Sequence, residues 1–177
     1  APDDPNVEKQ LLRSSFRDGV VRTRWRWTKD GQSAEFTLQL RVKQRSLIVD
    51  VQAPGGVATE FRLGRCAGLK KPRLVSVPYL TFGDGGPQIL LGDGLFLSAF
   101  LDWYNSDASE LFSASGIAGD DRAAFNGGSR YLPRTDGRRN ALRERLFITA
   151  SPTFEEVLPN IPNPRSDMIE TAKHHLW

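Results

Sequence analysis

The densest group of chemically capable side chains lies in one short segment beyond the middle of the chain. It joins two aromatic rings to a carboxylate and an amide, in the order Asp102, Trp103, Tyr104 and Asn105. Proteins bind sugars with this mixture, because an aromatic ring stacks on the C–H face of a sugar while polar groups bind its hydroxyls. The segment therefore predicts a carbohydrate site. The alternative is that Trp103 ends a core strand and that its polar neighbours only cap the residues that follow.

A second candidate lies near the start, where tryptophans alternate with arginines along an expected strand. Alternation puts one kind of side chain on each face: Trp25 and Trp27 on one, and Arg22, Arg24 and Arg26 on the other. The tryptophans would form a platform for a polysaccharide, and the arginines would suit an anionic glycan or nucleic acid. The alternative is that the tryptophans fill the core while the arginines coat the solvent face. We favour that alternative, because Val21 and Thr23 share the tryptophan face.

Further candidates lie near glycine-rich turns. Tyr79 precedes such a turn, and we expect it either to line a cleft or to pack with its hydroxyl group in water. Carboxylates in turns can ligate calcium, but an aspartate beside glycine more often serves the turn itself. The aspartates concerned are Asp84, Asp93, Asp120 and Asp121. Asp102 with Asp107 or Glu110 would supply the acid pair that glycoside hydrolysis needs.

Several functional classes are excluded or disfavoured. The single cysteine, Cys66, excludes a disulfide within the chain and a cysteine-ligated zinc site. The only histidines, His174 and His175, argue against a Ser-His-Asp triad within the fold. No apolar run approaches the roughly 18 residues of a membrane helix. The net charge of +3 is too small to indicate nucleic-acid binding, although 18 of the 24 basic residues are arginines.

The elements that must position these groups are strands. Residues 20–28 and 34–42 alternate in polarity around Asp30-Gly31, which predicts a β-hairpin. About nine such short strands, with turns between them and no βαβ alternation, predict an antiparallel β-sandwich. Residues 7–12 are expected to form a short helix or a covering strand. Asp107 and Glu110 have the spacing of a capping box, so we expect one short helix at 105–112.

Three segments are expected along the chain. Residues 1–19 form an N-terminal edge segment, 20–151 the β-sandwich domain, and 152–177 a proline-rich linker followed by the start of a helix. Because that helical pattern stops abruptly, we expect the chain to be part of a longer protein. No signal peptide is visible.

The order of several short segments resembles galactose-mutarotase-like β-sandwich modules. The segments are Arg24-Trp25-Arg26-Trp27, Asp30-Gly31, Ser46–Asp50, Val77–Gly83, Leu95–Trp103 and Ser151–Pro162. Such modules precede the catalytic barrel of large bacterial glycoside hydrolases and related proteins. Mutarotases use histidines with a carboxylate base, and residues 20–164 contain no histidine. The resemblance therefore implies a non-catalytic sandwich attached to a carbohydrate-active enzyme. We separately expect a secreted or periplasmic location.

The sequence thus predicts a polysaccharide-binding, non-catalytic module of a glycan-degrading enzyme. The expected binding residues are Trp103, Tyr104, Asp102, Asn105, Tyr79, Trp25, Trp27 and Arg26. The expected partners are a polysaccharide or oligosaccharide and an adjacent catalytic domain of the same polypeptide. No nucleic acid, membrane or cofactor is expected, and calcium binding is left open. Two alternatives remain: a carboxylate-dependent glycoside hydrolase or lyase acting alone, and a structural domain that docks onto a catalytic barrel.

Overall fold

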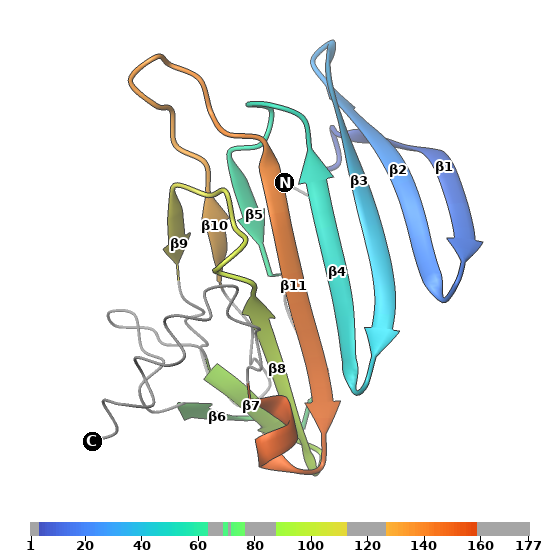
Figure 1. Cartoon of the computed structure of the whole chain (residues 1–177), viewed down its shortest axis with the longest axis vertical. Helices are drawn as coiled ribbons and strands as arrows, with labels where there is room; N and C mark the ends of the chain where they lie inside the picture. Colours follow the sequence, from blue (N-terminus) through green and yellow to red (C-terminus); the bar gives the residue numbers. More distant parts are fainter. Residues whose placement is uncertain (1–3, 64–68, 71, 77–87, 113–126, 159–177) are drawn as a thin grey trace.

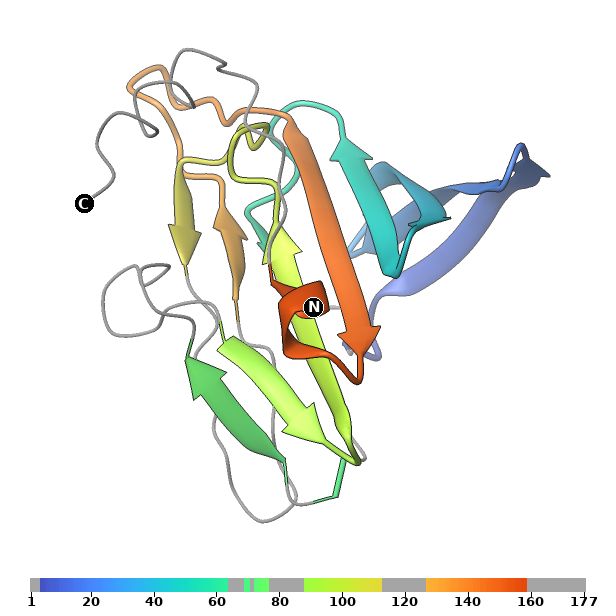
Figure 2. The same cartoon turned by 60° about the horizontal axis from the view of Figure 1, so that its bottom comes forward.

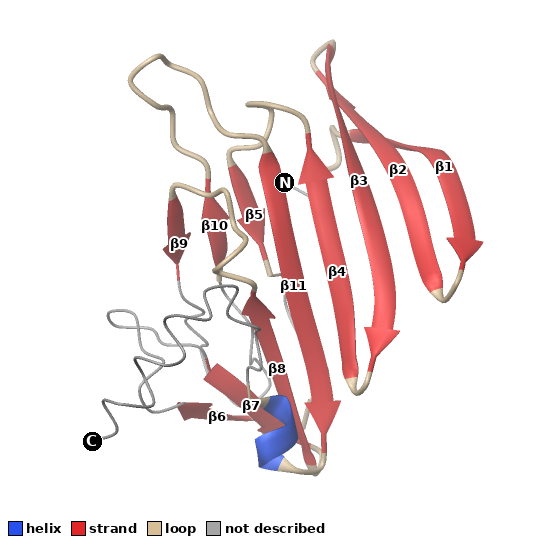
Figure 3. Cartoon of the chain, in the orientation of Figure 1, coloured by secondary structure: helices blue, strands red, loops and turns tan. Residues whose placement is uncertain are grey.

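The computed structural model describes residues 4–63, 69–70, 72–76, 88–112 and 127–158. In these residues the chain is all-β, as the sequence predicts, and its one helical element is a short 3-10 turn, η1 (Phe154–Val157) (Figure 3). The strands form two antiparallel sheets, which agrees with a sandwich-like architecture (Figure 1).

The large sheet has eight strands in the order β1-β2-β3-β4-β11-β8-β7-β6. Their bounds are β1 Glu8–Arg17, β2 Val20–Lys29, β3 Gln32–Lys43, β4 Ser46–Ala53, β6 Arg73–Ser76, β7 Gln88–Gly92, β8 Leu95–Leu101 and β11 Leu142–Ser151. The small sheet has the order β5-β10-β9, with β5 Glu60–Arg62, β9 Glu110–Phe112 and β10 Gly128–Arg130. β1 to β4 follow one another as a meander, whereas β11 reaches β4 from far along the chain.

Tight turns fix the register of the hairpins. Asp30 and Gly31 both have positive φ, 51° and 74°, and the same conformation recurs at Asp18-Gly19 and Asp93-Gly94. Glycine and, less readily, aspartate adopt these angles, which match the twist of a two-residue hairpin. A fixed register assigns every side chain of the flanking strands to one face of the sheet.

One face of the large sheet carries the core. Val51 and Leu142 pack there with the fully buried Tyr131, which follows β10, and Leu146 packs with Leu101 of β8. The small sheet covers this face over β4, β11 and β8, and β1 and β2 lie at the opposite end of the large sheet (Figure 2). Consequently, the apolar face of β1 to β3 extends beyond the covered core.

The opposite face is polar over β2, β3, β4 and β11. The cross-strand pairs Arg24↔Thr37, Thr37↔Gln52 and Gln52↔Arg143 place these four side chains in one row on this face. Nearer to β8, the polar face gives way to a second apolar cluster, in which Phe100 packs under Val157 of η1. We call the exposed part over β2, β3, β4 and β11 the polar face.

Three local expectations can be compared with the structure. The helix expected at 105–112 is wrong, because residues 110–112 form β9 and pair with β10. The Ser106 hydroxyl accepts the backbone N–H of Ala108, so a turn forms where the helix was expected. For residues 7–12 the strand alternative is confirmed, because β1 pairs along β2 as the edge strand. Residues 152–158 pack on the sheet through η1, and the rest of the expected linker lies outside the described residues.

Candidate functional site

The segment Asp102–Asn105 forms the start of a loop with buried and exposed parts. Asp102 is 2% exposed, donates its backbone N–H to the carbonyl of Arg145 at 2.8 Å, and accepts a hydrogen bond from the Asn105 side chain at 2.9 Å. Trp103 is half-buried against the cluster under η1, whereas Tyr104 is 43% exposed. The structure therefore exposes Tyr104, uses Asp102 and Trp103 as anchors, and ties the Asn105 side chain back to Asp102.

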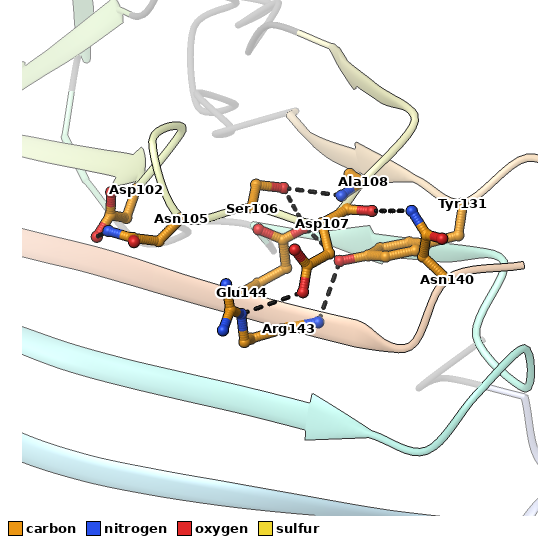
Figure 4. Close-up of polar contacts among 9 residues, drawn as sticks. All are labelled: Asp102, Asn105, Ser106, Asp107, Ala108, Tyr131, Asn140, Arg143 and Glu144. Carbon is orange, nitrogen blue, oxygen red and sulfur yellow. Dashed lines mark hydrogen bonds and ion pairs between the residues drawn. The ribbon is translucent and has the colours of Figure 1, made fainter. Parts of the chain in front are cut away.

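This loop runs beside β11 where β8 has ended. The last β8 residue paired with β11 is Leu101, so residues 142–145 of β11 present a free edge, which the loop meets. Figure 4 shows the resulting contacts. The Asn140 side chain donates to the backbone carbonyl of Asp107 at 2.8 Å, and Arg143 Nε forms an ion pair with Asp107 Oδ2 at 3.1 Å. These contacts hold Asp107 at the edge of the polar face.

A buried glutamate fastens the loop from the core side. Glu144 is 2% exposed, and its Oε1 accepts hydrogen bonds from the Tyr131 hydroxyl at 2.6 Å and from the Ser106 hydroxyl at 2.9 Å. The Tyr131 hydroxyl in turn accepts the backbone N–H of Arg143 at 3.2 Å. Burial, reinforced by the hydrogen bond to Glu144, raises the pKa of Tyr131 well above its usual value. The hydroxyl therefore stays protonated and remains a donor to Glu144.

A cleft of about 420 Å³ lies where the polar face meets this loop. Its polar lining comes from β2, β3, β4, β11 and the loop. Its apolar lining comes from a residue within β3, from the end of β4 and the start of β11, and from the residues next to those two ends. The lining residues are Arg24, Glu35, Thr37, Gln52, Asp107 and Arg143, together with Phe36, Ala53, Pro54, Ala141 and Leu142.

The cleft contains a straight row of hydrogen-bonding groups. Arg24, Thr37, Gln52 and Arg143 are cross-strand neighbours in turn, and adjacent strands lie about 4.8 Å apart. The row therefore spans about 14 Å across the strands. Its two ends are arginines, which only donate, and its middle has a hydroxyl and an amide, which donate and accept.

Ion pairs hold several arginines of the polar face in place. Glu35 accepts Arg26 at 2.6 Å and 3.0 Å, and Arg24 at 2.6 Å and 2.9 Å. The hydrogen bonds from Arg26 and then Arg24 lower the pKa of Glu35. Asp50 likewise bonds to both Arg41 and Arg145. Its partial burial raises the pKa, but the hydrogen bonds from these two arginines outweigh burial, so the pKa of Asp50 is lowered.

The two tryptophans lie on the opposite face from these arginines. Trp27 packs edge-on against Phe36 with ring centroids 4.9 Å apart, and Trp25 Nε1 donates to Thr23 at 3.0 Å. Both rings are half-buried on the apolar face beyond the small sheet. The structure therefore separates the expected site residues: Arg26 neighbours the cleft, whereas Trp25 and Trp27 do not.

Other expected site residues are turn residues or lie outside the described part. Tyr79, Asp84, Asp120 and Asp121 belong to the latter group. Asp93 is exposed in its hairpin turn and accepts the backbone N–H of Lys70 at 3.3 Å. Among the described residues no group of three His, Cys, Asp or Glu side chains is arranged to hold a metal ion. Nor does that part of the chain contain a helix long and apolar enough to cross a membrane.

Sequence reasoning missed most of the cleft. The alternation of β3 already placed Glu35 and Thr37 on a wet face, which was a usable signal. The positions of Gln52 and Arg143 beside them depend on the pairing of β4 with β11, which places these two residues opposite each other. Because these two strands are distant in the sequence, no local pattern indicates that they pair.

No family model matches this chain, and no curated protein or solved structure matches it either.

Proposed function

We propose that the chain is a polysaccharide-binding, non-catalytic β-sandwich module whose ligand occupies the cleft on the polar face. The observation that carries this proposal is the row Arg24–Thr37–Gln52–Arg143, which offers donors and acceptors along a line of about 14 Å. Sugar hydroxyls both donate and accept, so a glycan chain laid along the row can pair with each side chain in turn.

The cleft also offers fixed acceptors, and the loop that supplies one of them carries an exposed aromatic ring. Glu35 and Asp107 line the cleft and are each oriented by an arginine. Tyr104 is exposed on the loop that carries Asp107, and we assign it as the ring that stacks on a sugar. Because the cleft is open and its side chains are partly solvated, we expect modest affinity.

The surroundings of the acidic side chains favour binding over catalysis. A general acid needs a raised pKa, but the arginines lower the pKa of Glu35. Asp102, which belongs to both acid pairs considered from the sequence, is buried, and of its two expected partners Glu110 lies on β9 of the other sheet while Asp107 is ion-paired with Arg143. These observations support a binding module rather than a glycoside hydrolase or lyase acting alone.

Affinity gel electrophoresis against neutral and anionic polysaccharides tests the proposal. We expect retardation by at least one polysaccharide, and about tenfold weaker binding for Gln52→Ala, which removes an amide from the row. Gln32→Ala is the matched control, because Gln32 is exposed on β3 but does not line the cleft. The proposal is wrong if no polysaccharide retards the chain, or if both variants bind as the wild type does.

A second candidate function is docking onto an adjacent catalytic domain of the same polypeptide. The observation that favours it is the apolar face of β1 to β3, where Phe16 and Val42 are each 74% exposed. Leu11 and Val21 are also exposed on this face, and such patches mark interaction surfaces. This function predicts that the separately produced catalytic domain binds the chain and that Phe16→Asp abolishes the complex. An unchanged complex with Phe16→Asp would exclude this face as the interface.

A further inference from the structure

The arginines of the polar face differ in whether a carboxylate neutralises them. Five form ion pairs within the described residues: Arg24 and Arg26 with Glu35, Arg41 and Arg145 with Asp50, and Arg143 with Asp107. Two more, Arg13 on β1 and Arg22 on β2, are exposed and have no partner in the described part of the chain. These two therefore keep their guanidinium donors available to a ligand.

Arg13 and Arg22 flank an arginine that lines the cleft. Arg13 lies directly opposite Arg24 on the neighbouring strand, and Arg22 lies two positions before Arg24 on the same face. Opposite side chains have Cβ atoms about 5 Å apart, and positions two apart on a strand are separated by about 6.7 Å. Arg13, Arg22 and Arg24 thus form one group, the arginine cluster, at the β1–β2 end of the cleft.

A β-bulge creates this cluster. The register between β1 and β2 shifts between Leu11 and Arg13, where Leu12 is the extra residue. Leu11 faces the apolar side opposite Trp25, so regular alternation would place Arg13 on that side as well. The bulge instead directs Arg13 to the polar face, opposite Arg24. Bulges are used in this way to re-aim a side chain.

The cluster carries an excess of positive charge. Like charges directly opposite each other in a sheet are destabilising, and Arg13 faces Arg24 in this way. Glu35 supplies one negative charge, which Arg24 shares with Arg26. The acid of β1, Glu8, lies farther along, opposite Thr28. A bound anion would offset the remaining repulsion.

We infer that the glycan bound in the cleft is anionic and that Arg13 and Arg22, beside Arg24, bind its acidic group. This inference rests on the proposed function. The planar guanidinium fork binds a carboxylate or a sulfate through two parallel hydrogen bonds. The acidic group is therefore a uronate carboxylate or a sulfate ester, while Thr37 and Gln52 pair with hydroxyls farther along the chain.

Two pairs of polysaccharides that differ in charge test the inference. Polygalacturonate is compared with its methyl ester, and dextran sulfate with dextran, by affinity gel electrophoresis at about 150 mM salt, where surface charges are screened beyond about 8 Å. We expect the charged member of one pair to bind at least about tenfold more tightly than its neutral counterpart. The pair that shows this preference distinguishes a carboxylate from a sulfate ligand.

The double variant Arg13→Gln/Arg22→Gln is expected to lose the preference for the charged member. Arg73→Gln/Arg138→Gln is the matched control, because it removes the same charge from two exposed arginines outside the cleft. Binding of a glycan by the wild type with no preference for charge, or a preference that survives in Arg13→Gln/Arg22→Gln, would overturn the inference and leave the proposed function intact.

Two further outcomes separate the inference from its premise. Absence of binding to every polysaccharide would overturn the proposed function and the inference together. Double-stranded DNA serves as a polyanion control. If DNA retards the chain as strongly as the charged glycan, and Arg73→Gln/Arg138→Gln weakens both equally, the attraction is non-specific and the inference is overturned.

Discussion

Tyr131→Phe tests how the core holds the loop that carries Asp107. The substitution removes one oxygen atom and leaves the ring, so it changes packing little. It deletes the donor to Glu144 at 2.6 Å and the acceptor of the Arg143 backbone N–H at 3.2 Å. A hydrogen bond to a carboxylate contributes about 1.5–3 kcal/mol, and an orphaned backbone N–H costs about 1 kcal/mol or more. We therefore expect the free energy of unfolding to fall by about 2–4 kcal/mol.

Urea unfolding followed by circular dichroism measures this change, and thermal unfolding should show a Tm lower by about 4–16 °C for a chain of this size. The control is Tyr104→Phe, which makes the same substitution at an exposed ring and should change stability by less than about 0.5 kcal/mol. Equal stability of the two variants would refute the reasoning, because it would mean that the Tyr131–Glu144 contact contributes nothing.

Two other predictions concern the sheets. Gly128→Ala should strongly destabilise the fold, because its Cβ would lie 1.9 Å from the Phe61 carbonyl oxygen, whereas Gly55→Ala meets nothing within 4 Å and should be tolerated in the same unfolding assay. A tolerated Gly128→Ala would contradict the close approach of β10 to β5. The lowered pKa of Asp50 means that its stabilising contribution is present above the unfolded pKa of about 3.9 and is lost as pH falls through the lower folded value. In Asp50→Asn the free energy of unfolding should therefore fall less than in the wild type as pH is lowered below about 4, as measured by urea unfolding at several pH values. A pH dependence equal to that of the wild type would contradict the ion pairs.

The local part of the fold could be predicted from the sequence. The hairpin of β2 and β3 follows from alternation on both sides of Asp30-Gly31, whose positive φ angles confirm the turn. The same alternation correctly separates Trp25 from Arg26 on opposite faces. Alternation cannot predict how deeply each side chain is buried, because that depends on which part of the large sheet the small sheet covers.

The non-local part could not be predicted. The capping-box spacing of Asp107 and Glu110 indicates a helix, but pairing of Glu110 with Arg130 makes a strand there. The cleft likewise exists only because β11 returns to lie beside β4, which brings Arg143 next to Gln52. No short-range pattern specifies either pairing. The likeness to mutarotase-like modules, and the expected adjacent catalytic barrel, stay predictions.

The most direct test of the central claim compares variants on the two faces of the large sheet. Gln52→Ala changes the polar face within the cleft, and Phe16→Ser changes the exposed apolar face. The measurement is the dissociation constant of each variant for the polysaccharide that retards the wild type most. Our account predicts weaker binding by Gln52→Ala and unchanged binding by Phe16→Ser. The reverse result would place the ligand on the apolar face and contradict the account.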